Sequence, residues 1–420
     1  MLLLLYKLLT WSILLLIVPI LPLLDRVRPK FAKWFRLRFW PEPVHFTPSL
    51  WVHAVSVGEI NIALALLGGA ERVSKRVLIT TSTRSGFAFL TDKLGRQRVR
   101  YLPWDLTYCY KQLFHGVKQP DLVVVETEIW PHLFRFASSQ GARLMIVNGR
   151  LSKKTLRFRK LPLLTQTLNR ASVVAVRGSL DRERFLSLGM DPQKVRVTGN
   201  IKYDFQPRKL NSGPLQDWLE LNKGMLLFAS ISADEITLLL PAVSALSAAF
   251  PDRGILWAPR HLETLPVHLE ALAALNPVLR SELDDQSTPP QVVVLDSFGE
   301  LSGCYAYAGL SLIGGSFNQR GGQNFLESLQ AGAPAVMGPS THNFSREVEE
   351  AREAGAILTL NGPDEVEATL DALLRNPDSL AEMSIRARAF LQRGTGAIDR
   401  TRSLLLELGV PIDLESPENT

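Results

Sequence analysis

Short apolar runs rich in β-branched residues alternate with helix-length segments through nearly the whole chain. This alternation is typical of parallel sheets that are covered by helices on both faces, so we predict an α/β fold. The strands predicted for the first half are Leu50–Ala54, Val77–Thr81, Val99–Leu102, Leu122–Glu126, Arg143–Val147, Val173–Val176 and Val195–Thr198. Those predicted for the second half are Met225–Ala229, Ile255–Ala258, Val292–Leu295, Leu310–Ile313, Ala335–Met337 and Ile357–Leu360.

The alternation is interrupted between Asp204 and Pro214 by a polar stretch rich in Pro, Asn, Ser and Gly. A chain of 420 residues is also too long for one compact α/β core. We therefore predict two domains with their boundary in this stretch. We assign residues 1–24 to a membrane anchor, 25–205 to the first domain, 206–400 to the second domain and 401–420 to a tail.

The predicted anchor has no charged residue from Leu8 to Leu24. A helix of that length would reach ~26 Å, slightly short of the ~30 Å hydrocarbon core, so spanning and monotopic insertion both remain open. A cleaved signal peptide fits worse, because positive charge is missing before Lys7 and no small-residue cleavage site precedes the cationic stretch that follows. By the positive-inside rule, that stretch places the rest of the protein in the cytoplasm, with its cations and aromatic side chains at the headgroups. They are Arg26, Arg28, Lys30, Lys33, Arg36 and Arg38, interleaved with Phe31, Trp34, Phe35, Phe39 and Trp40.

The net charge of +6 is unevenly distributed along the chain. Residues 1–40 hold seven Lys/Arg and one Asp, which already accounts for it, so the charge is no sign of nucleic-acid binding. Residues 41–204 hold 25 basic and 12 acidic residues, whereas residues 205–420 hold 15 and 28. Opposite charges in the two halves indicate different partners, and a phosphorylated lipid would suit the basic half beside an anchor.

The two cysteines, Cys109 and Cys304, are far apart and form no metal-ligand pair. A disulfide framework, zinc chemistry and redox chemistry therefore have no support, and a reducing compartment is favoured.

Polar residues gather where predicted strands end, which is where open α/β sheets bind their ligands. These junctions are His53–Glu59, Thr80–Gly86, Glu126–Trp130, Asn148–Ser152, Gly199–Asp204, Pro259–His261, Asp296–Glu300 and Gly314–Glu327.

Glu59 follows a strand and stands where a helix would begin. It could take a proton from an attacking hydroxyl, but Ser56-x-x-Glu59 is also the spacing of a capping box, which spacing alone favours. The positive end of the helix dipole would favour the ionised form of Glu59. Glu126 and Glu128 flank Thr127, so on an extended strand end both would point the same way, and either could be an ordinary rim carboxylate.

The second half offers anion and ribose ligands. Gly314 to Asn324 followed by a helix could cradle a phosphate with loop amides, or be a plain turn. Glu327 could accept bonds from two ribose hydroxyls or be solvated, and Arg260 could bind a phosphate or lie on the surface. We expect His261 to have a structural role and not a catalytic one. The basic cluster Lys153, Lys154, Arg157, Arg159 and Lys160 could contact membrane or phosphate, or form a solvated helix face.

Taken together and in this order, the junctions resemble the 3-deoxy-D-manno-octulosonic acid (Kdo) transferases of lipopolysaccharide assembly. The similarity runs from the anchor to roughly residue 400. The strings that carry it are His53–Glu59, Tyr101–Asp105, Glu126–Pro131, Asn148–Ser152, Gly199–Asp204, Ala258–His261 and Gly314–Phe344.

The resemblance implies a GT-B fold with two Rossmann-like domains facing a cleft, the first for the lipid A precursor and the second for CMP-Kdo. It implies an inverting transfer at the cytoplasmic side of a bacterial inner membrane, without cofactor or metal. Glu59 would be the base, and Glu126 and Lys202 would stabilise the transition state. The CMP-binding residues would be Pro259, Arg260, Phe298, Gly299, Glu300, Asn324, Phe325, Leu326 and Glu327.

Three positions depart from the family pattern, because Ser232, Gln323 and Ser340 stand where the family has histidines. All three fall in the donor domain. A transferase that uses another nucleotide sugar, and a membrane-tethered binding protein without catalysis, therefore stay open as alternatives.

Overall fold

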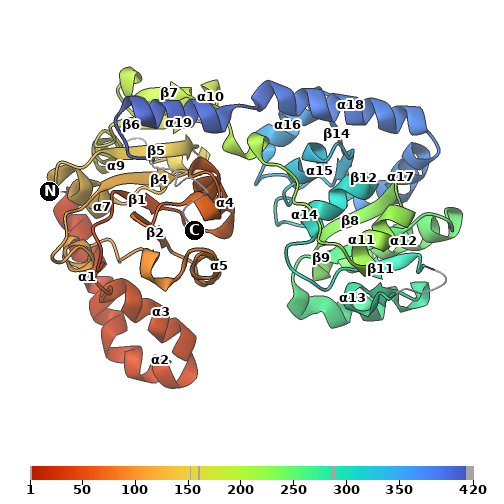
Figure 1. Cartoon of the computed structure of the whole chain (residues 1–420), viewed down its shortest axis with the longest axis horizontal. Helices are drawn as coiled ribbons and strands as arrows, with labels where there is room; N and C mark the ends of the chain where they lie inside the picture. Colours follow the sequence, from red (N-terminus) through yellow and green to blue (C-terminus); the bar gives the residue numbers. More distant parts are fainter. Residues whose placement is uncertain (1, 152, 159–160, 285–288, 413–420) are drawn as a thin grey trace. The chain divides into compact units, whose positions relative to one another are not determined.

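The computed structural model describes residues 2–151, 153–158, 161–284 and 289–412 (Figure 1). These residues form two compact units, one made of residues up to Asp204 together with those from Thr395 on, and the other of Phe205–Gly394. Each unit contains one parallel sheet with helices around it, which confirms the predicted α/β class.

The first unit is built on seven parallel strands in the order β3-β2-β1-β4-β5-β6-β7. Its strands are β1 Leu50–His53, β2 Val77–Thr81, β3 Val99–Tyr101, β4 Asp121–Val125, β5 Leu144–Gly149, β6 Val173–Val176 and β7 Val195–Val197. All the strands predicted for this half are confirmed to within two residues. The winding direction reverses between β1 and β4, which pair from Leu50 with Asp121 to His53 with Val124.

Helices cover both faces of this sheet, and their apolar sides join the strands in one core that includes Trp51, Tyr110 and Phe134. The Asp105 carboxylate fixes the start of α7 by accepting from the amides of His132 at 3.0 Å and Leu133 at 2.8 Å. The helices are α1 Leu2–Ile17, α2 Leu21–Val27, α3 Pro29–Phe39, α4 Val57–Leu66, α5 Arg84–Leu94, α6 Thr107–Leu113, α7 Pro131–Ser139, α8 Lys153–Leu156, α9 Pro162–Leu168, α10 Ser179–Ser187 and α19 Ala397–Glu407.

The second unit repeats this plan with the order β10-β11-β9-β8-β12-β13-β14, again parallel throughout. The predicted strands are again confirmed to within two residues, and β10 was missed because its two residues are too short for an apolar run. The strands are β8 Met225–Ile231, β9 Ile255–Pro259, β10 Val278–Leu279, β11 Val292–Val294, β12 Ala308–Ile313, β13 Ala335–Met337 and β14 Ile357–Thr359. The helices are α11 Pro214–Leu221, α12 Ile236–Ala249, α13 Leu265–Leu272, α14 Leu301–Cys304, α15 Leu326–Gln330, α16 Ser345–Glu353, α17 Val366–Leu374 and α18 Pro377–Gly394.

The chain returns to the first unit after α18, so the predicted domain end at residue 400 is corrected to Gly394. The Asp204 carboxylate holds the start of α19, because it accepts from the amides of Gly396 and Ile398 at 2.6 Å each. The Arg402 guanidinium then donates to the Leu66 carbonyl at 2.8 Å, at the end of α4. The tail predicted for 401–420 is therefore, as far as residue 412, part of the first unit, and residues 413–420 lie outside the described residues.

The N-terminal stretch Leu3–Val27 is long and apolar enough, by length and composition alone, to cross a membrane. Its helix is interrupted by a short 3-10 turn at Val18–Ile20, between α1 and α2. Leu14 and Leu21 face inward and pack with Phe35 and Phe39 of α3. Trp11, Ile17 and Leu24 pack against this cluster in part, whereas Leu8, Leu9, Leu15 and Leu16 point outward and are between 55% and 74% exposed.

The cations and aromatics after the apolar stretch do not all face outward, which corrects the prediction that they lie at the headgroups. Arg38 is only 5% exposed, lies over the rings of Trp34 and Trp104, and donates through Nε to the Leu102 carbonyl at 2.8 Å. Phe35 is fully buried. Helix α3 is therefore fastened to the first unit along one side, and its remaining cations lie on the other.

Candidate active site

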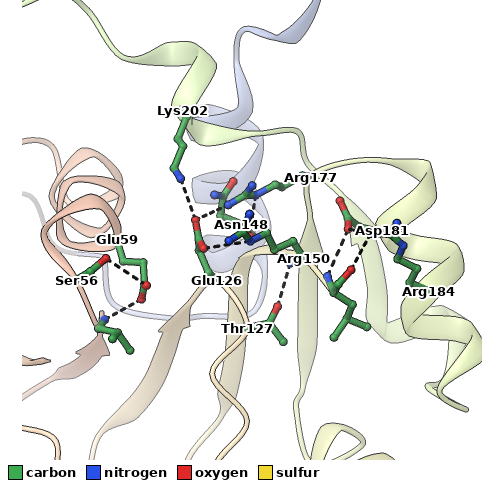
Figure 2. Close-up of polar contacts among 12 residues, drawn as sticks. Ser56, Glu59, Glu126, Thr127, Asn148, Arg150, Arg177, Asp181, Arg184 and Lys202 are labelled. Atoms are coloured by element: carbon green, nitrogen blue, oxygen red, sulfur yellow. Dashed lines mark hydrogen bonds and ion pairs between the residues drawn. The ribbon is translucent and has the colours of Figure 1, made fainter. Parts of the chain in front are cut away.

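Two carboxylates lie at the switch point of the first sheet, the place between β1 and β4 where the winding direction reverses (Figure 2). Glu59 lies in the first turn of α4, just after β1, and Glu126 directly follows β4. Lys202, in the short turn Ile201–Asp204 after β7, brings its Nζ within 3.2 Å of Glu126 Oε1. The structure thus brings Glu126 and Lys202 into contact and places Glu59 at the adjacent strand end.

Hydrogen bonds hold the Glu59 carboxylate against the loop before its own helix. Its Oε2 accepts from the Val55 amide at 2.7 Å, and its Oε1 accepts from the Ser56 hydroxyl at 3.4 Å. Ser56 is the N-cap residue, but its side chain accepts no hydrogen bond from the helix amides. The reciprocal capping box is therefore not formed, and Glu59 restrains the loop as an acceptor from both residues.

Burial raises the pKa of Glu59 to about 7. The Val55 amide opposes this increase, Glu126 and Glu128 add to it, and Lys202 again opposes it. The expectation that the helix dipole would favour the ionised form is therefore wrong in its net effect, since loss of solvation outweighs it. A carboxyl group with a pKa near 7 is partly ionised at neutral pH and can exchange protons with a substrate hydroxyl.

Glu126 has a left-handed backbone conformation with φ of 59°, so the prediction that Glu126 and Glu128 point the same way from an extended strand is wrong. Glu126 turns toward cations: Arg177 bonds its Oε1, and Arg150 Nε lies 3.5 Å from its Oε2. Glu128 instead accepts from Trp130 Nε1 at 3.1 Å. Strain of this kind costs roughly 1–3 kcal/mol and is kept where surrounding contacts fix it.

The cations decide the charge of Glu126. Burial alone would raise its pKa, but Arg177, Lys202 and Arg150 together hold the pKa at about 2. Burial lowers the pKa of Lys202, while Glu126 raises it. Glu126 is therefore a permanent carboxylate, in contrast to Glu59.

Sequence reasoning missed Arg177 and the part played by Asn148. Arg177 directly follows β6, and a basic residue at a strand end was the signal that could have identified it. Its side chain is 6% exposed. Asn148 is fully buried near the end of β5, and its Oδ1 accepts from the Ile201 amide at 3.0 Å, which positions the turn that carries Lys202.

The switch point of the second sheet, between β8 and β12, carries the glycine-rich loop. Several amides of this loop donate hydrogen bonds inside the protein. Buried Glu235 accepts from Gly315 at 2.7 Å and Phe317 at 3.0 Å. The Gly321 amide donates to Ser340 Oγ at 3.2 Å, and Gly322 and Gln323 donate to the carbonyls of Gly315 and Gly314. Glu235 was not identified from the sequence, although its spacing from Ser232 fits the capping box that it forms.

Ser232, Gln323 and Ser340, where the resemblance leads one to expect histidines, lie around this loop. Ser232 forms the capping box with Glu235 and accepts from Asn318 Nδ2 at 2.9 Å. The Gln323 side chain occupies the space beside Gly315, whose φ of 67° suits glycine. The Ser340 hydroxyl accepts a hydrogen bond from the Gly321 amide. Ser232 and Ser340 therefore help to fix the loop through hydrogen bonds.

Arg260 follows β9 and is exposed, while its own amide donates to the Ile231 carbonyl at 2.8 Å. Pro259 is the last residue of β9. Arg208, which sequence reasoning missed, lies near Glu327, whose pKa is raised by burial and lowered by Asn324, Arg208 and Arg260. Asn324 Nδ2 donates to Glu327 Oε1 at 2.8 Å, so Glu327 is not the solvated helix residue of the alternative reading.

The remaining residues that were predicted to bind CMP differ in which of their groups are exposed. The ring of Phe298 is 78% exposed and Gly299 adopts φ of 88° beside it. Glu300 pairs with Arg280 at 2.6 Å. The side chains of Phe325 and Leu326 are buried in the core, so only their backbone can face a ligand. For the basic cluster near residue 155, residues 159–160 lie outside the described residues, and Arg157 is exposed.

Comparison with known proteins places this geometry in one family. Residues 26–205 match the family model for 3-deoxy-D-manno-octulosonic-acid transferase (kdotransferase). The 3-deoxy-D-manno-octulosonic acid transferase of Haemophilus influenzae is 30% identical over 85% of this chain and 86% of its own length. The chain belongs to the Kdo transferase family. The transferase of the same name from Chlamydophila psittaci is 30% identical over 89% of both chains.

The chain has the GT-B architecture of two parallel-sheet α/β domains. Anabaena Alr3699/HepE in complex with UDP superposes with a TM-score of 0.57 at 13% identity, covering 86% of this chain and 100% of that chain. At that identity the match describes the fold alone.

Proposed function

We propose that this protein is an inverting glycosyltransferase that transfers Kdo from CMP-Kdo to a phosphorylated lipid A precursor on the cytoplasmic side of a bacterial inner membrane. The observation that carries the proposal is Glu59, a buried carboxyl group with a pKa near 7 at the sheet switch point of a Kdo transferase. Membership of the family over 85% of the chain supports the same donor and reaction.

In the proposed reaction, Glu59 removes the proton of an acceptor sugar hydroxyl. The hydroxyl oxygen forms a bond to the anomeric carbon of Kdo, and the bond from that carbon to the phosphate oxygen breaks, with its electron pair leaving on CMP. A single displacement inverts the anomeric carbon. The proton ends on the Glu59 carboxyl group, which releases it to solvent.

The transition state carries positive charge on the Kdo ring and growing negative charge on the departing phosphate. Glu126, held ionised by its three cations, offsets the first. Lys202, whose side chain is only 22% exposed and whose ammonium group lies next to Glu126, offsets the negative charge on the departing phosphate. On the donor unit, Arg260 and Arg208 are the cations for the CMP phosphate, and Glu327 is the acceptor for ribose hydroxyls.

The test is transfer of Kdo from CMP-Kdo to lipid A precursor by the purified protein in detergent. Glu59→Gln should lower kcat at least a hundredfold, the usual contribution of a general base. Glu71→Gln, which alters an exposed carboxyl group of the same unit, is the control and should keep its activity. Absence of transfer by the wild type would refute the proposed function, and an unimpaired Glu59→Gln would refute the base.

A further inference from the structure

A cavity of about 400 Å³ lies in the first unit, outside the cluster around Glu59 and Glu126. Three helices line it. Helix α1 contributes Leu3, α7 contributes Pro131 and Arg135, α9 contributes Leu163, Gln166 and Thr167, and Arg170 follows two residues after the end of α9. Residues 131 and 135 are four apart on α7, and residues 163, 166 and 167 are three and four apart on α9, so each of these two helices turns one face to the cavity.

The cavity has a positive wall. None of its lining residues is acidic, and among the described residues no carboxylate forms an ion pair with Arg135 or Arg170. Arg170 Nη1 donates to Ser138 Oγ at 3.1 Å, which fixes its guanidinium beside α7. Burial lowers the pKa of the neighbouring His132, Asp105 opposes this, and Lys7 and Arg135 lower it further. Two guanidinium groups suit a phosphate dianion.

The surroundings of the cavity are apolar. Helices α1 and α9 are in contact. Leu4, Leu5 and Leu8 of α1 are 54% to 59% exposed, and Phe158 and Leu161, just before α9, are 53% and 47% exposed. A positive cavity lined by helix α1, which also carries exposed leucines, has the chemistry that receives the phosphorylated head of an amphiphile at a membrane surface.

The cavity is also close in the chain to the catalytic strand end. Helix α7 begins at Pro131, five residues after Glu126, and Arg135 lies one turn further on. A ligand whose phosphate sits at Arg135 therefore starts next to the carboxyl edge of the sheet that carries the candidate base.

We propose that this cavity binds a phosphate group of the acceptor glycolipid through Arg135 and Arg170, so that the lipid part lies against α1 while the sugar approaches Glu59. The identity of this ligand rests on the proposed function. The chemistry of the cavity, phosphate on an amphiphile, would be shared by the headgroup of an anionic phospholipid.

The experiment compares Arg135→Gln/Arg170→Gln with Arg182→Gln/Arg196→Gln, which removes two arginines that do not line the cavity. Binding of the lipid A precursor, with its phosphates and after phosphatase treatment, is measured in neutral detergent without donor. The cavity variant should bind the phosphorylated lipid at least tenfold more weakly than wild type and the dephosphorylated lipid equally. In the transfer assay its KM for the phosphorylated acceptor should rise similarly, with kcat within twofold.

Two arms separate the possible outcomes. If the cavity variant keeps its acceptor affinity but loses binding to phosphatidylcholine vesicles that contain phosphatidylglycerol, the ligand is a bilayer headgroup and the acceptor assignment is overturned. Equal weakening by both double variants would also overturn it. Because binding is measured without transfer, a wild type that binds the phosphorylated lipid through Arg135 and Arg170 but transfers no Kdo would refute the proposed function and leave the cavity assignment standing.

Discussion

Glu59→Gln should stabilise the folded protein above pH 7 while it removes activity. The structure raises the pKa of Glu59 from its ordinary value of 4.5 to about 7, mainly by burial. Each pKa unit corresponds to roughly 1.4 kcal/mol, so ionising this carboxyl costs the folded state about 3 kcal/mol relative to the unfolded chain. Glutamine avoids this cost because it never ionises, and its oxygen can still accept from the Val55 amide.

The sign of the pH dependence follows from proton binding. Between pH 4.5 and 7 the folded state holds the proton while the unfolded state has lost it. The free energy of unfolding of the wild type therefore falls as pH rises through this range and is constant above it. The stability advantage of Glu59→Gln should accordingly grow from below roughly 1 kcal/mol at pH 5 to about 3 kcal/mol at pH 8.

Thermal unfolding at pH 5 and pH 8 measures this difference. For a unit of this size, about 3 kcal/mol corresponds to a Tm increase of roughly 6–12 °C at pH 8. Glu71→Gln, the exposed control, should show no comparable pH-dependent difference. A Glu59→Gln protein that is less stable than wild type at pH 8, or an advantage that does not change between the two pH values, would refute the argument from burial.

Further predictions concern other parts of the site. The kcat/KM of the wild type should fall tenfold per pH unit below about pH 7, because the base must be ionised; a flat pH profile down to pH 5 would contradict this. Glu126→Gln should lower the free energy of unfolding by about 3 kcal/mol in urea, since it leaves Arg177 buried without its carboxylate, and unchanged stability would show that the ion cluster contributes little. Glu235→Gln replaces an oxygen acceptor of the glycine-rich loop by an NH2 group, so calorimetry should show at least tenfold weaker CMP binding; an unchanged affinity would separate the loop from the donor site. CMP should bind the wild type more tightly than UDP, and the reverse order would favour a different nucleotide sugar.

The strands were predictable because fully buried parallel strands need apolar residues on both faces, and such runs are visible locally. Val77–Thr81 and Val173–Val176 were predicted with their observed bounds. The pair Val278–Leu279 could not be found, since two residues carry no pattern.

The candidate site was predictable in its members and less so in their geometry. Glu59, Glu126 and Lys202 were named from strand ends and from family resemblance, and they occupy the same edge of the first sheet. The direction of Glu126 depends on its left-handed backbone conformation, which is held by Arg177 from a strand about 50 residues later. Likewise, Glu235 accepts from the glycine-rich loop because β8 and β12, which precede these two segments, are neighbours in the sheet. A local sequence pattern does not show which strands are neighbours.

By itself, the sequence determined the α/β class, the apolar N-terminal stretch, the division near residue 205 and the junctions at which polar residues gather. These properties follow from periodicity, composition and local turn chemistry, which can be recognised from residues that are close together in the sequence. The tertiary structure decided that β1 lies beside β4, that α19 returns to the first unit, and that Glu59 has a pKa near 7 while Glu126 stays ionised. Burial and ion pairing depend on residues far apart in the chain, so the same residue type acquires two different charges at neighbouring strand ends.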